Sequence, residues 1–524
     1  VGIVALPLAM AFAIAGGLTP QAGLWTAIVG GFLISFFGGS SVQIGGPAGA
    51  FIVVVYGIVE RYGLSGLLLS TGAAGCLLFL MGWLRLGSLV RYVPVSIVIG
   101  FTNGIAVLVA LSQIKDFLGL NVPNMPADFW GILQTLGQNL GAFNPWALGM
   151  ASAGVLVLLV WQAGGRRMVH APSPWVRGVA SMPGSIVVLV LATALTAWCG
   201  LPLETIGSRF GGIPSNLPSW VWPEFSWASA QALVMPTLTL ALLGAIESLL
   251  CARVADGMIG DRHNPNQELM AQGVANFVTP FFGGMPATGT IARTVTNVKS
   301  GGRTPVAGIV HALALLLVVW VAAPLANHIP LATLAAILMF VAWNMGEWHA
   351  FKDLKQFRMP YRITLLAVFL LTVMVDLTVA VEFGLIAACI TFIYRISSLS
   401  RIEQLSEKDT DKLAHQSGQI SAYRAYGALF FGAVKLIEDI ENILPQKALV
   451  LDLKNLIYID SSGADALLAL GRLCHKKQVR LIVCGLNHQP LDIARRTGFL
   501  DLIGQNALPD YDSGLDAALL SEKR

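Results

Sequence analysis

The chain has 524 residues, of which 55% are hydrophobic and 12% are charged, and its formal net charge is +4. The charged fraction is about half of the roughly 25% usual in soluble globular proteins, which excludes a single soluble globular domain and indicates many membrane-spanning segments. Charge is scarce as far as about Ser397 and ordinary afterwards. We therefore expect a transmembrane domain over residues 1–397, a linker over residues 398–417 and a soluble domain over residues 418–524.

The chain begins at Val1 inside an apolar run, so we expect that the native N-terminus was trimmed or left out. About seven apolar segments precede residue 200 and about seven lie between residues 230 and 394. Several are shorter than the roughly 20 residues of a full span, which predicts half-helices or tilted pieces. Basic residues gather in the loops after even-numbered segments, so the positive-inside rule predicts a cytoplasmic N-terminus.

The third segment of each set carries a glycine- and proline-rich interruption. In the first set a β-prone piece, Val42–Ile44, leads into Gly45-Gly46-Pro47; in the second, the interruption is Gly283-Gly284-Met285-Pro286. An odd number of spans per set places the two sets in opposite orientations. Interrupted segments at matching places in two inverted halves are the best indication from sequence of a transporter's binding site.

The second interruption leads into a short stretch rich in small residues, with Arg293 as its charge. Pro286 is suited to the first turn of a new helix. The positive end of such a helix, together with Arg293, would favour an anion. The alternative is a cytoplasmic loop in which one helix stops and another starts.

Glu247 lies in an otherwise uncharged apolar run. Ionisable groups at membrane depth are costly and face a cavity or a partner, and apolar surroundings favour the neutral form of a carboxyl group. These properties predict a proton-coupling role for Glu247, and a structural ion pair with Arg293 is the alternative. The hydroxyls of Ser248 and of Thr288, Thr290 and Thr294 would suit an oxyanion, although such side chains also serve as packing contacts.

No P-loop, nucleophile elbow or zinc motif is present in the sequence, so we expect neither ATP-driven pumping nor an enzyme, and no metal or other cofactor. The last hundred residues alternate between strand and helix patterns, which predicts a small α/β domain. Within it, Asp460 or Ser461 stands where a helix N-terminus is expected. Capping is one interpretation, and a phosphate site or phosphorylation of Ser461 is the regulatory alternative.

Several motifs resemble the sulfate permease (SulP) family of anion transporters over essentially the whole chain. They are Pro20–Ala27 continuing to Gly38–Ser41, Asn266–Leu269 with Gly273 and Asn276, and Gly301–Thr304 with Ala307 and Gly308. Trp25 and Ser41 depart from the family's tyrosine and basic residue. The tail, with Ile459-Asp460-Ser461-Ser462-Gly463, is similar to the family's STAS domain.

The resemblance implies a polytopic α-helical membrane protein of 14 segments in a 7+7 inverted repeat, with core and gate domains and two half-helices that meet at the midplane. It implies a substrate between half-helices that start near Pro47 and Thr288. The positions that match the family's pocket are Phe12, Gly46, Pro47, Ala48, Glu247, Ser248, Ala292 and Arg293.

The function implied is secondary active transport of sulfate, bicarbonate or a dicarboxylate, as proton-coupled symport by an elevator-like movement. Expected partners are the small anion, the proton, membrane lipid, a second copy in a homodimer and a cytoplasmic protein bound to the STAS domain, with no nucleic acid. The expected location is the bacterial cytoplasmic (inner) membrane. The alternatives are a nucleobase-type carrier of the same fold and a membrane-anchored signalling or scaffold protein that acts through its STAS domain.

Overall fold

The computed structural model describes residues 1–88, 94–122, 125–126, 128–168, 182–212, 218, 220–222, 231–375, 377–405 and 419–520. The chain divides into two compact units, Val1–Leu385 and Ile386–Arg524.

The first unit is built from helices. Those of its first half are α1 (Gly2–Ala15), α2 (Pro20–Trp25), α3 (Gly31–Phe37), α4 (Ile52–Trp83), α5 (Val95–Leu118), α6 (Phe129–Asn139), α7 (Pro145–Met168), α9 (Gly184–Cys199) and α10 (Ile206–Phe210). Those of its second half are α12 (Val234–Ile259), α13 (Pro265–Val278), α14 (Ile291–Lys299), α15 (Val306–Ala326), α16 (Leu331–Met345), α17 (His349–Lys352), α18 (Met359–Met374) and α19 (Leu377–Leu399), in which the unit ends. Among the described residues, six helical stretches are long and apolar enough to cross a membrane, and a bent pair that includes α16 raises this number to seven.

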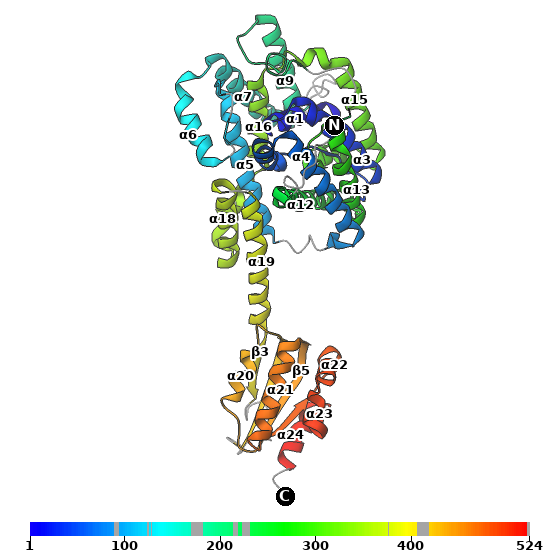
Figure 1. Cartoon of the computed structure of the whole chain (residues 1–524), viewed down its shortest axis with the longest axis vertical. Helices are drawn as coiled ribbons and strands as arrows, with labels where there is room; N and C mark the ends of the chain where they lie inside the picture. The colour runs from blue at the N-terminus through cyan, green and yellow to red at the C-terminus, as the bar shows by residue number, and fades with distance from the viewer. Residues whose placement is uncertain are drawn as a thin grey trace. The chain divides into compact units, whose positions relative to one another are not determined.

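These helices pack in two groups. One contains α3, α4, α12, α13 and α15, the other contains α5, α7, α16 and α18, and α1 contacts members of both (Figure 1). Each group takes helices from both halves of the sequence. The group that contains α4 and α12 corresponds to the core expected for the fold, and the group that contains α5 and α16 corresponds to the gate.

Breaks in the backbone fall where the sequence contains glycine. In α4 the helical conformation is interrupted at Gly63, which has φ of +70°. The apolar runs Ala48–Val59 and Leu64–Trp83, which the sequence predicts as two segments, are therefore joined at this residue. The first segment starts with the 3-10 turn η2 (Gly49–Phe51), and a π-helical turn η1 (Thr26–Gly30) joins α2 to α3.

Two local predictions were wrong. The β-prone piece Val42–Ile44 is not a strand: it bonds to side chains at the start of α14 and on its buried face, and its backbone bond toward β2 is from the Thr290 amide to the Ile44 carbonyl oxygen; the strand β1 is Gly45–Gly46. Pro286 does not start a helix either. It precedes the two-residue strand β2 (Thr288–Gly289), and α14 begins only at Ile291.

The second unit contains a five-stranded sheet in the order β3-β4-β5-β6-β7. Its strands are β3 (Arg401–Leu405), β4 (Ile420–Leu429), β5 (Ala448–Ile459), β6 (Arg480–Cys484) and β7 (Ala507–Leu508). β3 runs antiparallel to β4, and the remaining neighbours are parallel. The helices are α20 (Lys435–Glu441), α21 (Ser461–Lys476), α22 (His488–Arg496), α23 (Phe499–Ile503) and α24 (Tyr511–Leu520).

Each face of this sheet has its own apolar core. Side chains of α20, α21, α22 and α23 pack on one face, and those of α24 pack on the other. The sequence predicts two strands here, Ile420–Tyr426 and Ala428–Phe431, but the structure has one strand, β4, whose pairing with β5 shifts register between Arg424 and Tyr426 and again after Gly427. β3 lies inside the stretch predicted as a linker, whose residues 406–417 are outside the described residues.

Candidate functional site

Two short strands join the two halves of the first unit. β1 pairs antiparallel with β2, so that Gly45 lies opposite Gly289 and Gly46 lies opposite Thr288. A helix begins a few residues after each strand, η2 continuing into α4 on one side and α14 on the other. The N-terminal ends of two helices therefore lie close together at this bridge, where their unpaired N–H groups favour a negative charge.

One face of α14 holds this helix against the extended segment before β1. The Thr290 hydroxyl donates to the Ile44 carbonyl oxygen at 2.9 Å, and the Ile44 amide donates to the Thr294 hydroxyl at 3.0 Å. The Asn297 side chain donates to the Val42 carbonyl oxygen at 2.9 Å. Because residues three and four apart share one face of a helix, these bonds fix the rotation of α14 about its axis.

The segment before β2 is fixed in the same way. The Met285 amide donates to the Thr26 hydroxyl at 2.7 Å. The Asn276 side chain bonds to both backbone groups of Ala287, accepting from its N–H and donating to its C=O, each at 2.8 Å. Both segments that enter the bridge are thus held by buried side chains.

Arg293 is buried at the start of α14, with only 2% of its surface exposed. Its Nη1 and Nη2 atoms are buried and have no hydrogen-bond partner among the residues that the structure describes. A Cβ placed on Gly46 would lie 2.2 Å from Nη1, so the guanidinium fills the space beside the Gly46 backbone, which has φ of +152°. A buried cation without a counter-charge is strongly disfavoured, and an anion bound beside Nη1 and Nη2 would supply that charge.

Other residues named from the sequence lie around the same bridge. Phe12 on α1 is 6% exposed, and its ring lies 3.5 Å from where a Cβ on Gly49 would stand. Pro47 and Ala48 are buried between β1 and η2, whereas Ala292 is exposed on the first turn of α14. Phe12, Pro47 and Ala48 thus lie at or beside the start of η2, and Ala292 lies on the exposed start of α14.

The hydroxyls of the site are used within the protein. Thr288 donates to the Gly244 carbonyl oxygen at 3.2 Å, and Thr290 and Thr294 bond to Ile44 as described above. Ser248 is completely buried and donates to Glu268 at 3.2 Å. These contacts favour a positioning role for the four side chains over direct contact with an oxyanion.

Glu247 lies on α12, one residue before Ser248, and is partly buried. In the part of the chain that the structure describes, its carboxylate forms no hydrogen bond and no ion pair within 4 Å. The ion pair with Arg293 considered from the sequence is therefore absent. Glu247 remains a free carboxyl group on one of the helices that pack around the bridge.

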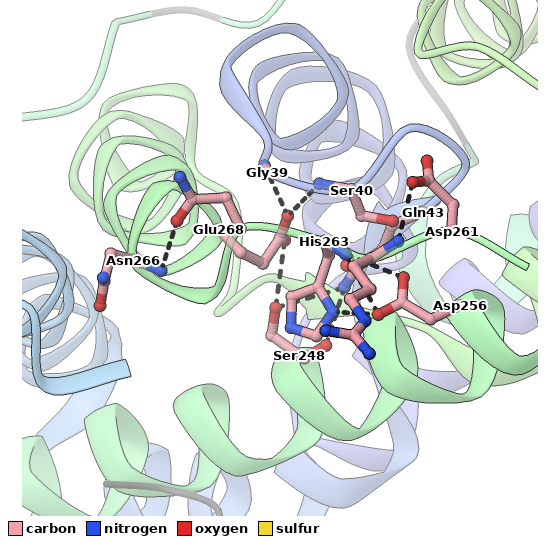
Figure 2. A network of polar contacts seen from close by, with 11 residues as sticks. Gly39, Ser40, Gln43, Ser248, Asp256, Asp261, His263, Asn266 and Glu268 are labelled. Atoms are coloured by element: carbon pink, nitrogen blue, oxygen red, sulfur yellow. Dashed lines mark hydrogen bonds and ion pairs between the residues drawn. The ribbon is translucent and has the colours of Figure 1, made fainter. Parts of the chain in front are cut away.

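A polar network beside the bridge escaped the sequence analysis (Figure 2). At its centre is Glu268 on α13, which is 0% exposed. Its Oε2 atom accepts from the amides of Gly39 at 2.9 Å and Ser40 at 3.2 Å, and its Oε1 atom accepts from Ser248 and, at 2.9 Å, from Gln272. The sequence feature that could have identified Glu268 is its position as a carboxyl group within the Asn266–Leu269 motif, next to an apolar run.

The network continues to Gln43 and to the turn between α12 and α13. Gln43 donates to the Ser248 hydroxyl at 3.2 Å and to the Ser248 carbonyl oxygen at 3.3 Å. In the turn, the Nδ1 atom of His263 lies 2.6 Å from Oδ2 of Asp256 (Figure 2). The side chain of Asn264 caps α13. These contacts fix the position at which α13 starts.

In the second unit, Asp460 is the N-cap of α21. Its Oδ1 atom accepts from the Gly463 amide at 2.8 Å, and its Oδ2 atom accepts from the Phe431 amide at 3.2 Å. Ser461 is the exposed first residue of the helix. These bonds favour the capping interpretation of Asp460.

Within the described ranges, no group of three or more His, Cys, Asp or Glu side chains could hold a metal ion.

The sequence of residues 1–368 matches the model of the Sulfate permease family, and that of residues 411–513 matches the STAS domain. The chain belongs to the sulfate permease family. It is a bacterial multi-pass membrane protein of a transporter family and not an enzyme.

Similarity to individual proteins extends over nearly the whole chain. The "Putative sulfate transporter YvdB" of Bacillus subtilis is 39% identical over 98% of this chain and 94% of the relative. The "Bicarbonate transporter BicA" of Picosynechococcus is 32% identical over 89% of this chain and 83% of the relative.

Solved structures show the same fold. The murine Slc26a9 anion transporter in the inward-facing state superposes with a TM-score of 0.88 at 18% identity, covering 99% of this chain and 90% of that one. The transmembrane domain of a cyanobacterial BicA gives a TM-score of 0.64 at 33% identity, covering 72% of this chain and 94% of that one. The expected inverted-repeat membrane core with a C-terminal STAS domain is confirmed.

Proposed function

We propose that this family member carries a small anion across the membrane by binding it between the N-terminal ends of η2 and α14, against the guanidinium of Arg293. The observation that supports this site best is the buried guanidinium, whose two terminal nitrogens have no hydrogen-bond partner within the described part of the chain. A planar guanidinium can donate two parallel hydrogen bonds to a carboxylate, carbonate or sulfate group. Unpaired N–H groups at the two helix ends add donors for the remaining oxygens.

The proposed substrates are sulfate, bicarbonate or a dicarboxylate. They share oxygen atoms in a geometry that one guanidinium can bind through two nitrogens. Relatives named as sulfate and bicarbonate transporters support these two ions as the first to test. Phe12 and the short residues Gly46, Pro47 and Ala48 would give an anion bound there small and partly apolar surroundings, which would suit a compact ion.

Glu247 is the proposed proton-coupling group, and coupling would make the transport symport. It is a carboxyl group on α12 without a hydrogen-bond or ion-pair partner among the described residues, next to Ser248. A proton taken up by Glu247 on the outer side would offset one negative charge of the incoming anion. Release of that proton inside would then couple anion entry to the proton gradient.

An elevator-like movement of the core group of helices against the gate group is the proposed route between the two sides. Both strands of the bridge, together with α4, α12 and α14, belong with the core group, so the site would move as one body.

The remaining proposals are domain limits of 1–397 and 418–524, a homodimer, and a cytoplasmic partner or regulatory site at Asp460 and Ser461 of the STAS domain.

Uptake into proteoliposomes tests this function. Purified full-length protein is reconstituted and supplied separately with labelled sulfate, bicarbonate, succinate and uracil, with and without an inward proton gradient. Gradient-stimulated uptake of at least one anion is expected. Uptake of uracil alone would instead indicate a nucleobase carrier, and absence of any uptake by well-folded protein would favour a signalling or scaffold role.

A further inference from the structure

Glu268 holds the segment that leads into β1 at two places. Its Oε2 atom fixes the start of the segment through the amides of Gly39 and Ser40. Its Oε1 atom fixes Gln43 through Ser248. Only Ile44 separates Gln43 from β1, so one carboxylate sets both the entry and the end of this segment (Figure 2).

Gln43 carries this constraint to the opposite strand. A Cβ on Gly289 would lie 1.4 Å from the Nε2 atom of Gln43, so the side-chain amide of Gln43 occupies the space beside Gly289. Gly289 is the residue of β2 that pairs with Gly45. The chain of contacts from Glu268 through Ser248 and Gln43 therefore ends against the bridge itself.

The direction of the hydrogen bonds along this chain is fixed. The amides of Gly39 and Ser40 can only donate, and so can the Nε2 groups of Gln272 and Gln43. Ser248 accepts from Gln43, so its single proton is directed to Glu268. Four donors converge on Glu268, which matches an ionised carboxylate and not an amide, because an amide has only one acceptor oxygen.

We infer that Glu268 is a positioning residue for the anion site, holding β1 and β2 in register through Ser248 and Gln43. The inference rests on the proposed function, in which the anion binds at this bridge. Glu268 thus contributes to the affinity for the anion without contacting it, because its own hydrogen bonds are with Gly39, Ser40, Ser248 and Gln272.

Glu268→Gln tests the inference because the amide has the same shape and leaves no buried charge. Hydrogen–deuterium exchange of the full-length protein is followed in peptides covering residues 42–46 and 288–290. The amide replaces one carboxylate oxygen, and each oxygen accepts two hydrogen bonds, so two bonds to a charged group are lost and exchange should be at least about ten times faster in both peptides. Sulfate or bicarbonate, whichever the wild type binds, should bind roughly five to ten times more weakly to the folded variant.

Gln267→Ala is the matched control. Gln267 donates to the Phe37 carbonyl oxygen at 2.7 Å, so it also ties α13 to the end of α3, but this bond lies outside the chain that leads to Gln43. Exchange at residues 42–46 and anion affinity should stay at wild-type values in this variant. Adding Ser248→Ala to Glu268→Gln should weaken binding no further, because both changes break the same chain.

Unchanged exchange at residues 42–46 in Glu268→Gln would overturn the inference, and so would an equal effect of Gln267→Ala. The exchange measurement needs no anion, so it decides this inference even where the wild type binds none of the ions tested. Failure of the wild type to bind any anion would overturn the proposed function instead.

Discussion

The guanidinium of Arg293 and the backbone of Gly46 occupy adjacent space, because a Cβ on Gly46 would lie 2.2 Å from Nη1 of Arg293. The two residues come from opposite halves of the membrane unit and are brought together by the pairing of β1 with β2. The absence of a side chain at position 46 thus decides where the cation lies. Binding of an anion to Arg293 at the proposed site therefore depends on the glycine at position 46.

Gly46→Ala is expected to weaken anion binding by at least tenfold while Arg293 is still present. The new methyl group would overlap Nη1, and φ of +152° disfavours any residue with a Cβ. Isothermal titration with sulfate and bicarbonate measures the loss. Gly57→Ala on α4 is the control, since a Cβ there meets no atom within 4 Å; equal affinity of the two variants would contradict the proposed position of the guanidinium.

Glu247→Gln mimics the protonated carboxyl group. Anion binding and anion exchange should persist, because the amide keeps the size of the side chain, while stimulation of net uptake by an inward proton gradient should disappear. Proteoliposome uptake with and without the gradient measures this difference. Glu60→Gln, an exposed carboxyl group on α4, should retain the stimulation. Full gradient-driven accumulation by Glu247→Gln would mean that the coupling proton uses another group.

Sequence patterns were sufficient to locate the broken helices and to select Arg293 as a candidate. Glycine and proline interruptions, and a charge in a stretch of small residues, are local features of the sequence. They were not sufficient for the hydrogen bonds that hold these pieces. Glu268 bonds to Gly39 and Ser40, which are more than two hundred residues away, and no local pattern reports such a contact. Thr290 and Thr294 were suitable for an oxyanion by composition, and only the position of Ile44 shows that their hydroxyls are engaged.

Removal of residues after Ser400 should leave a membrane unit that still binds anion. All residues of the proposed site, from Phe12 to Arg293, lie before the cut. Titration of the purified truncated protein should give an affinity within about threefold of that of the full chain. A well-folded truncated protein that bound no anion would show that the STAS domain contributes to the site.

Asp460→Ala should destabilise α21 by about 1 kcal/mol, since it removes the cap that accepts from the Gly463 amide. Ser461→Ala should change stability by less than about 0.5 kcal/mol, because Ser461 is exposed. Hydrogen exchange of the Ser461–Lys476 peptide in the intact chain separates the two variants, with roughly fivefold faster exchange expected for Asp460→Ala. A larger effect of Ser461→Ala would assign the structural role to the serine.

Arg293→Ala gives the most direct test of anion binding at the bridge. Isothermal titration of the purified, folded variant with sulfate and bicarbonate should show affinity lower by about 1.5–3 kcal/mol, or roughly ten- to a hundredfold, because hydrogen bonds to a charged group are lost. Lys299→Ala, which removes an exposed cation from the other end of α14, should bind as the wild type does. Wild-type affinity in Arg293→Ala would contradict the account, because the anion would then bind without the buried guanidinium.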